Sequence, residues 1–205
     1  MRTAWPVVLV ATTNPGKIRE IAAVMAGFPA TWHTLGDLAP IPEPPETGTT
    51  FAENARLKAV AYAGASGLPT VAEDSGLAID ALDGRPGVHS ARYPGGTYAE
   101  KFTGLYEELA AHARPWSAQF VAAVAFAVPD GKHVAVLCEC QGHVAGEIVP
   151  APRGSHGFGY DPIFAYPPDG RTGGELSAEE KLAHSHRGAA FRQFRAWLEA
   201  QPVSR

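Results

Sequence analysis

Residues 7–25 read VVLVATTNPGKIREIAAVM, and this stretch decides the class of fold. The run 7–11 is apolar and rich in β-branched residues, which is typical of a buried strand. Asn14 follows as a candidate helix N-cap, and Pro15 suits the first helical position. Apolar residues then recur at helical spacing until Gly27, which is a helix stop signal. The chain is therefore predicted to open with a strand, a tight loop and a helix.

Strand and helix signals alternate beyond this opening. Thr50 and Glu53 form a capping box, which predicts a helix that ends near Gly64. The apolar stretches 68–72 and 77–82 predict two core strands. The other predicted elements are a helix over 98–113, a hairpin of 118–128 and 133–140, a strand over 144–149, and an amphipathic helix over 185–200 with Ser185 as its N-cap. Because the hairpin excludes a purely parallel sheet, we expect a mixed sheet in an α/β fold.

The composition limits the classes of protein to consider. A chain of 205 residues fits one domain, or two small lobes. Its formal net charge of −4 argues against a protein that coats nucleic acid or anionic membranes. No apolar run approaches the ~20 residues of a membrane span, and the stretch from Met1 to Pro6 is not typical of a signal peptide. We therefore expect a cytoplasmic protein with no nucleic-acid partner and no membrane partner.

A candidate anion site follows the first predicted strand. Its residues are Thr12, Thr13, Asn14, Pro15, Gly16 and Lys17. Backbone N–H groups at a helix start attract anions, and Lys17 adds a positive charge. The residue order is not that of a Walker A loop. The pattern fits both a phosphate-binding loop and an ordinary strand-to-helix turn.

A second candidate site is acidic. Glu73 and Asp74 lie between the two predicted core strands, where Gly76 would let the backbone turn. Adjacent carboxylates at a strand end suit a hard cation such as Mg²⁺, and Glu46 is a further acidic residue near an element end. A metal between carboxylates and phosphates would neutralise charge and orient an attacking water. The structural alternative is a solvated turn.

Two further segments carry side chains suited to a nucleotide. The glycine-rich segment 154–161 permits close approach of a ligand, and Phe158 and Tyr160 offer stacking faces. Lys181 and Arg187 flank the start of the last predicted helix and could bind phosphate or carbonyl oxygens. The structural alternatives are a glycine-rich hairpin and a solvated helix start.

Taken in order, these motifs resemble one family. The motifs are TTNPGKIREI at 12–21, ETGTTFAENARLKA at 46–59, EDSGLAIDALDGRPGVHSARY at 73–93, FGYDPIF at 158–164 and EKLAHSHRG at 180–188. From Val7 to Phe194 the chain resembles the noncanonical purine NTP pyrophosphatases, which include the inosine and xanthosine triphosphate pyrophosphatases.

The resemblance implies a fold and a reaction. The fold is a single domain over residues 1–205, with a long curved mixed β-sheet flanked by helices and two lobes around a central active-site cleft. The implied assembly is a homodimer. The implied reaction is Mg²⁺-dependent hydrolysis of ITP, dITP and XTP to the monophosphate and pyrophosphate, which removes deaminated purines from the nucleotide pool.

The resemblance also implies residue roles. Residues 12–17 match the family's phosphate loop, Lys58 matches a second lysine near the phosphates, and Ser75 matches a substrate contact. Asp74 matches the catalytic, metal-binding carboxylate, and Glu46 a metal-associated glutamate. Glu73 is a third candidate metal ligand and stands where many relatives carry Asp. The remaining implied substrate contacts are Phe158, Gly159, Tyr160, Asp161, Lys181, His186 and Arg187.

The implied reaction agrees with the chemistry of these residues. Cleavage between the α and β phosphates needs a water aimed at the α phosphorus and neutralisation of the charge on the leaving pyrophosphate. We expect Asp74, assisted by Glu46 and Glu73, to position Mg²⁺ and the water. Lys17, as a third catalytic residue beside Asp74 and Glu46, is expected to hold the phosphates together with Lys58.

Base choice depends on position 6 of the purine, which carries oxygen in hypoxanthine and xanthine and an amino donor in adenine. Donors such as His186 and Arg187 are expected to pair with that oxygen, and Phe158 is expected to stack on the base. Two other interpretations remain: a Maf-like nucleotide pyrophosphatase and a non-catalytic nucleotide sensor. The segments at 158–161 and 185–188 argue against the first of them.

Overall fold

The computed structural model describes residues 4–202, so Met1, Arg2 and Thr3 of the N-terminal stretch discussed above lie outside the described residues. Within this range the strands are β1 (Val7–Val10), β2 (Thr31–Thr34), β3 (Thr70–Ile79), β4 (Trp116–Asp130), β5 (His133–Ile148) and β6 (Phe164–Ala165). The α-helices are α1 (Pro15–Val24), α2 (Phe51–Ser66), α3 (Tyr98–Leu109), α4 (Ala178–His184) and α5 (His186–Glu199).

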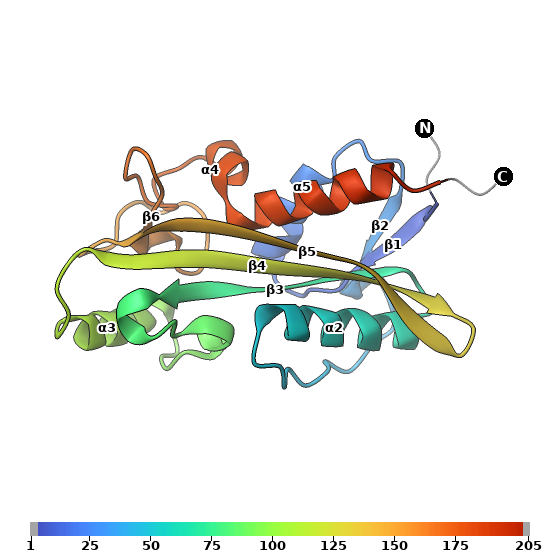
Figure 1. Ribbon diagram of the computed structural model, residues 1–205, viewed down its shortest axis with the longest axis horizontal. Coiled ribbons are helices and arrows are strands. Elements are labelled where there is room, and N and C mark those ends of the chain that lie inside the picture. Colours follow the sequence, from blue (N-terminus) through green and yellow to red (C-terminus); the bar gives the residue numbers. More distant parts are fainter. Residues whose placement is uncertain (1–3, 203–205) are drawn as a thin grey trace. The chain divides into compact units, whose positions relative to one another are not determined.

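The strands form one sheet in the order β2-β1-β3-β4-β5-β6 (Figure 1). Strand β1 pairs in parallel with β2 and with β3, whereas β5 and β6 pair antiparallel. The predicted α/β class, with a mixed sheet flanked by helices, is confirmed. The predicted opening is also confirmed, because β1 is followed by α1 with Asn14 as its N-cap.

The chain divides into two compact units. The first contains the residues up to Asp74, residues 122–142 and the residues from Arg187 onward, and the second contains residues 75–121 and 143–186. The divisions fall inside β3, β4 and β5 and after the first residue of α5. Each unit has its own buried apolar cluster, so each is described by itself.

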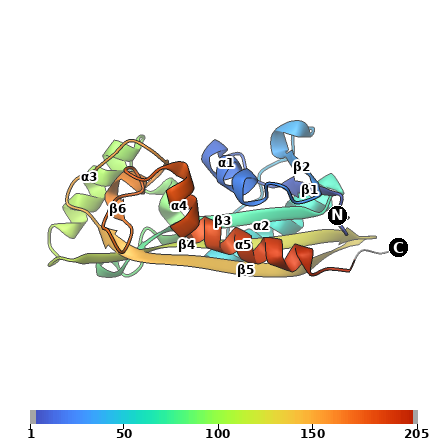
Figure 2. The same ribbon diagram turned by 90° about the horizontal axis from the view of Figure 1, so that it is seen from above.

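In the first unit, helices cover both faces of the strands. Alternate residues of β4 point to opposite faces, since a strand has a side-chain period of two. Ala122, Val124 and Phe126 pack with α1 and α5, whereas Ala123, Ala125 and Ala127 pack with α2. Figure 1 shows α2 and α5 on opposite sides of these strands, and Figure 2 shows α5 running along the β4–β5 hairpin.

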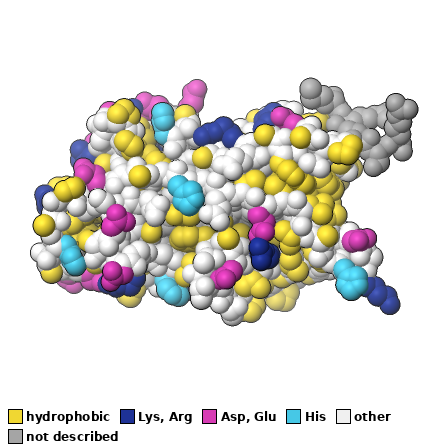
Figure 3. All heavy atoms as spheres, viewed as in Figure 1, with side chains coloured by type: hydrophobic (Ala, Val, Ile, Leu, Met, Phe, Trp, Pro, Cys, Tyr) yellow, Lys and Arg dark blue, Asp and Glu magenta, His cyan; other side chains and the backbone are white. Residues whose placement is uncertain are grey.

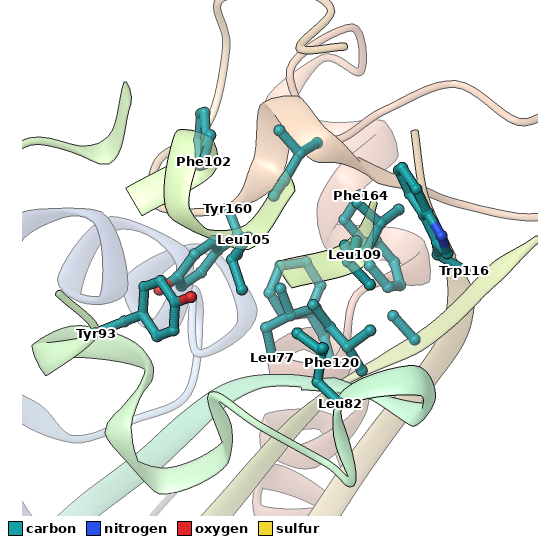
Figure 4. Packing of buried hydrophobic residues seen from close by; sticks show 14 of the residues in the cluster. Leu77, Leu82, Tyr93, Phe102, Leu105, Leu109, Trp116, Phe120, Tyr160 and Phe164 are labelled. Carbon is teal, nitrogen blue, oxygen red and sulfur yellow. The ribbon is translucent and has the colours of Figure 1, made fainter. Parts of the chain in front are cut away.

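In the second unit, α3 packs on the ends of the strands. Leu105 and Leu109 of this helix are fully buried against Leu77 and Phe120, which come from β3 and β4 (Figure 4). Tyr160, which the sequence suggested as a stacking face for the substrate, belongs to this buried cluster. Its hydroxyl donates a hydrogen bond to the Ser90 carbonyl at 2.8 Å.

Strand β3 differs from the sequence prediction. The sequence suggested two strands separated by a turn at residues 73–76, but the structure has one strand from Thr70 to Ile79. Gly76 is needed for close packing rather than for a turn, because a Cβ there would lie 2.3 Å from Ser90 Oγ and 2.6 Å from the Gly87 carbonyl oxygen. As a result, Glu73 and Asp74 project from the middle of a buried strand.

Other boundaries also differ. The predicted strand over 144–149 is the end of the longer β5, and the helix predicted over 98–113 ends at Leu109. The predicted helix over 185–200 starts one residue later, directly after α4, and Ser185 lies at the C-terminal end of α4. A capping box of Ser177 and Glu180 starts α4, a helix that the sequence analysis does not predict.

The visible surface carries positive and negative side chains interspersed rather than gathered by sign (Figure 3). Among residues 4–202, no helix combines the length and the apolar character needed to cross a membrane.

The close packing at Gly76 generates a stability prediction. Gly76→Ala should lower the free energy of unfolding by about 1–3 kcal/mol, because the added Cβ must displace Ser90 or the backbone at Gly87. Gly64→Ala is the matched control, since this exposed position in α2 has only Val134 Cγ2 at 3.6 Å. It should raise stability by about 0.5–1 kcal/mol through helix propensity. Urea denaturation measures both, and equal effects of the two substitutions would contradict the packing argument.

Candidate active site

The loop between β1 and α1 is built around Asn14. Its side-chain oxygen accepts hydrogen bonds from the backbone N–H groups of Gly16 at 2.9 Å and Lys17 at 3.2 Å. Its carbonyl oxygen accepts from the Ile18 N–H at 3.0 Å, and Pro15 has no N–H to offer. The first donors of α1 are thus committed to Asn14. The Lys17 side chain is the cation of this loop, and phosphate binding by the loop stays a prediction.

Glu73 faces α1 and α5. It shares this side of β3 with Val71, which packs in the cluster formed with α1 and α5. Its carboxylate lies 2.9 Å from Lys17 Nζ and 3.0 Å from Arg187 Nη2. Burial lowers the pKa of Lys17 below its ordinary value, Glu73 opposes this shift, and Arg187 adds to it.

Asp74 faces the other helix, α2. It shares this side of β3 with Ala72, which packs in the cluster formed with α2. Lys58 Nζ of α2 lies 2.9 Å from Asp74 Oδ1 and 2.8 Å from Glu46 Oε1. Asn54 Nδ2 donates to the second Asp74 oxygen at 3.3 Å. Lys58 therefore bridges the two carboxylates that the sequence analysis connected with a metal.

Burial and the ion pairs of Lys58 shift the pKa values of both Asp74 and Lys58. Burial raises the pKa of the Asp74 carboxyl above its ordinary value, although Lys58 opposes this. Burial alone would lower the pKa of Lys58, but Asp74 and Glu46 outweigh it, so the pKa lies above its ordinary value. Since one ammonium serves two carboxylates, the lysine is held firmly in its charged form while each carboxylate has only a share of the compensating charge.

Two of the three predicted carboxylate ligands, rather than all three, are placed to bind one divalent cation. Consecutive residues of a strand point to opposite faces, so Glu73 does not join Asp74 and Glu46. Consistently, the described part of the chain contains no group of three or more His, Cys, Asp or Glu side chains that could hold a metal. Two carboxylates completed by water and substrate phosphates are a usual environment for Mg²⁺. Glu46 and Asp74 fit this pattern, and the predicted third ligand, Glu73, does not.

In the second unit, the Asp161 carboxylate organises the glycine-rich segment. One of its oxygens accepts from the Phe158 N–H at 2.7 Å and lies 2.5 Å from Lys181 Nζ. A Cβ at Gly157 would lie 2.1 Å from this carboxylate, and one at Gly173 would lie 2.7 Å from it. Asp161 is only 2% exposed, so the structure places this predicted substrate contact beneath the loop rather than on its surface.

Phe158 is the more accessible part of this arrangement, whereas Lys181 is buried and only 3% exposed. The Lys181 ammonium lies 4.5 Å from the centroid of the half-buried Phe158 ring, a cation–π geometry. His186 stacks on Phe120 with ring centroids 4.8 Å apart. Gly159, also predicted as a substrate contact, is half-buried and close to Tyr98.

The structure brings the predicted residues together in two sets, one in each unit. Lys17, Glu46, Lys58, Glu73, Asp74 and Arg187 belong to the first, and Phe158, Asp161, Lys181 and His186 to the second. Ser75 begins the second unit within β3, and Thr12 and Thr13 lie in the loop before α1. Sequence reasoning did not single out Glu20, Asn54 and Phe120. Glu20 and Asn54 had a usable signal, because Glu20 lies three residues after Lys17 on one helix and Asn54 lies four residues before Lys58 on another.

Comparisons with known proteins identify the family. A model of the Ham1 family matches residues 8–197. A dITP/XTP pyrophosphatase of Thermus thermophilus is 47% identical over 94% of this chain and 90% of that protein. A dITP/XTP pyrophosphatase of Syntrophobacter fumaroxidans is 42% identical over 95% of this chain and 86% of that protein. The solved structure of a HAM1 protein from Coxiella burnetii aligns with a TM-score of 0.86 and 39% identity, covering 95% of this chain and 99% of that one.

The Lys58 bridge generates a pH-dependent prediction. Lys58→Met should lower the free energy of unfolding by about 3–5 kcal/mol near pH 8, because Asp74 and Glu46 stay buried without their cation. The pKa of Asp74 is already raised and should rise further in the variant. The folded variant then takes up protons more readily than the unfolded chain, so its deficit should shrink as the pH falls towards about 5.

Chemical denaturation at several pH values measures this deficit against the unsubstituted protein. Arg56→Met is the matched control on the same helix, since Arg56 forms an exposed ion pair with Glu139 at 2.8 Å. Its effect should stay below about 1 kcal/mol at every pH. A Lys58→Met deficit that is independent of pH would show that the carboxylates are not buried as a coupled pair.

Proposed function

Because this chain belongs to the Ham1 family, we propose that it hydrolyses noncanonical purine nucleoside triphosphates such as dITP, ITP and XTP, releasing the monophosphate and pyrophosphate. It is a nucleoside-triphosphate pyrophosphatase, and this activity cleanses the nucleotide pool. The observation that carries the proposal is a pair of lysines, Lys17 and Lys58, held 2.9 Å from the carboxylates of adjacent strand residues. This charge set suits a triphosphate together with a divalent cation.

Phosphate binding is assigned to Lys17 and Lys58. Lys17 stands at the start of α1, where the helix dipole adds to its positive charge. Because Asn14 uses the first N–H groups of α1, binding there depends on the Lys17 ammonium rather than on a backbone cradle. Lys58 supplies the second cation from α2. Together they offset the charge that develops on the leaving pyrophosphate.

The pyrophosphatases of this family are generally metal-dependent, and Mg²⁺ is the ion that this donor set favours. Asp74 and Glu46 would hold it, and it would neutralise phosphate charge and activate water. Asp74 also orients the attacking water through its carboxylate, while Asn54 fixes the second Asp74 oxygen. Lys58, which neutralises both carboxylates, is placed to exchange that contact for a phosphate oxygen.

Base binding is assigned to Phe158 and the side chains around it. Phe158 offers a ring for stacking, with the Lys181 ammonium beside it. Asp161 holds both groups, so its role is to position them rather than to touch the base. Lys181 and His186 supply donors for the oxygen at position 6 of hypoxanthine or xanthine. Adenine would present an amino donor to these donors and leave them unpaired, which disfavours ATP strongly.

We assign the enzyme to the cytoplasm, where its nucleotide substrates are synthesised and used. We also propose a homodimer, the assembly that the family resemblance implies. Light scattering after size-exclusion chromatography gives the mass directly, to be compared with 21.6 kDa for one chain.

The reaction itself is the main test. With Mg²⁺ present, ITP, dITP and XTP should give the monophosphate and pyrophosphate, and ATP and GTP should give little. Removal of divalent cations with EDTA should abolish turnover, and added Mg²⁺ should restore it. Asp74→Asn should lower kcat by about 100-fold or more, since a preorganised charge at the reacting centre is lost.

Chromatography of the products distinguishes the outcomes. Diphosphate plus phosphate would overturn the assignment of the α–β bond. Tight binding of ITP without turnover would favour the nucleotide sensor instead. Unchanged activity of Asp74→Asn at saturating Mg²⁺ would remove Asp74 from the reacting centre while leaving the substrate assignment in place.

The stacking role of Phe158 has its own test. Phe158→Ala should raise KM for ITP about tenfold and change kcat much less, because stacking contributes to ground state and transition state alike. Phe158→Tyr keeps the ring and should stay close to the unsubstituted enzyme. Steady-state kinetics separates the two parameters. A loss confined to kcat would contradict stacking on the base.

A further inference from the structure

The hydroxyl of Tyr98, the first residue of α3, lies beside the glycine-rich segment of the second unit. A Cβ at Gly159 would be 3.5 Å from the Tyr98 hydroxyl oxygen. Gly159 directly follows Phe158, whose ring the proposed function assigns to stacking on the base, and consecutive Cα atoms are about 3.8 Å apart. Because Gly159 has no side chain, it leaves the hydroxyl uncovered next to the residue where the nucleoside would lie.

Three neighbours hold the Tyr98 ring in place. The ring packs edge-on against Tyr160, with centroids 5.4 Å apart and an interplanar angle of 89°, and the Phe102 centroid lies at 6.1 Å. The Lys101 ammonium lies 5.0 Å from the centroid of the Tyr98 ring and donates to the Ala91 carbonyl at 2.6 Å. A side chain restrained in this way has little freedom left to lose when a ligand binds.

The Tyr98 hydroxyl is available, unlike those of three other tyrosines in the same unit. Each of the three donates its hydroxyl proton to an oxygen of the protein, and they are Tyr93, Tyr106 and Tyr160. Among residues 4–202, the Tyr98 hydroxyl has no hydrogen-bond partner, and the residue is 41% exposed. A fixed phenol with an unused hydroxyl combines an apolar body with a polar end that can bind a ligand.

The surroundings of Tyr98 keep its hydroxyl protonated. Burial, and after it the negative charge of Asp161, raise the pKa of Tyr98 above its ordinary value. The phenol can therefore both donate and accept a hydrogen bond at neutral pH. Asp161 also accepts from the Phe158 N–H and pairs with Lys181, so one buried carboxylate interacts with all three residues.

We propose that Tyr98 is a further substrate contact, whose hydroxyl hydrogen-bonds a polar atom of the nucleoside that stacks on Phe158. The proposal rests on the proposed function and deepens it, because the sequence analysis does not include Tyr98 among the site residues. Carbonyl oxygens of the base and hydroxyls of the sugar offer the same hydrogen-bonding chemistry. Since both belong to the unreactive part of the substrate, the contact should strengthen ground state and transition state alike.

Tyr98→Phe tests the proposal, because it removes the hydroxyl and keeps the ring. KM for ITP should rise by about 3-fold to 10-fold, as expected for one neutral hydrogen bond, and kcat should change by less than about twofold. Tyr106→Phe is the matched control, since it makes the same change on the same helix but removes a hydroxyl that donates to the Val149 carbonyl at 3.0 Å. Its kinetics should be unchanged while its melting temperature falls.

Two other ligands separate a nucleoside contact from an effect on phosphate binding. Inorganic triphosphate, used as an inhibitor of ITP hydrolysis, should bind equally well to Tyr98→Phe and to the unsubstituted protein, because it lacks the nucleoside. IMP should bind to Tyr98→Phe about 3-fold to 10-fold more weakly, as measured by calorimetry. Thermal unfolding checks that both variants are folded under the assay conditions.

The substrates then identify the atom that Tyr98 contacts. A smaller increase in KM for dITP than for ITP would assign the contact to the 2′-hydroxyl, which dITP lacks. A larger increase for XTP than for ITP would assign it to the oxygen at position 2 of xanthine. Equal increases for all three would assign it to a group that they share.

Unchanged KM together with unchanged affinity for IMP in Tyr98→Phe would overturn the proposal. An equal weakening of inorganic triphosphate, or a loss confined to kcat, would overturn it as well. Failure of the proposed function has a different signature. If the unsubstituted protein does not hydrolyse ITP, the pyrophosphatase assignment fails, while calorimetry with IMP still decides whether Tyr98 contacts the nucleoside. If IMP does not bind either, both proposals fall.

Discussion

The side-chain period of strand β3 is the constraint on which the site depends. Two acidic residues in succession, Glu73 and Asp74, are buried in the middle of this strand and must point to opposite faces. A buried carboxylate needs a cation, so each face must supply its own. On one face α1 brings Lys17 and α5 brings Arg187, and on the other face α2 brings Lys58. The three helices that flank the strands of the first unit are thus also the three sources of positive charge.

Packing brings these charges within bonding distance. On the α2 side the contact is made largely by alanines, with Ala55 and Ala59 on the helix and Ala123 and Ala125 on β4. Small side chains let a helix lie close to a sheet, which allows Lys58 to reach Asp74 from the same helix. The other face is filled by larger aromatic groups, and there the longer guanidinium of Arg187 makes the connection.

Local signals made part of this arrangement predictable from the sequence. The N-cap at Asn14 and the capping box at Thr50 depend on residues within one helical turn, so the starts of α1 and α2 follow directly from the sequence. The mixed sheet and the family were accessible in the same way, since they depend on patterns and motifs. The faces of β3 could not be predicted in this way. A turn at Gly76 divides the predicted strand in two, so the alternation of side chains along one continuous strand was not apparent.

Relations between distant parts of the chain were also out of reach. Arg187 and Glu20 are 167 residues apart, and no local pattern connects them. Asp161 looks like a ligand contact in the sequence, and only the glycines at 157 and 173 around its carboxylate reveal an interior group. Charge type and motif order therefore predict which residues belong to the site, whereas the direction of each side chain follows from packing.

Three helices, α2, α3 and α4, begin with reciprocal capping boxes, at Thr50, Thr97 and Ser177. Each box satisfies the helix start with side chains of the helix itself, so the preceding loop contributes little to where the first turn forms. Insertions and deletions in those loops can then accumulate over evolution without shifting the helical register. The lysines on α2 and α4, Lys58 and Lys181, therefore keep a fixed phase relative to the starts of their helices.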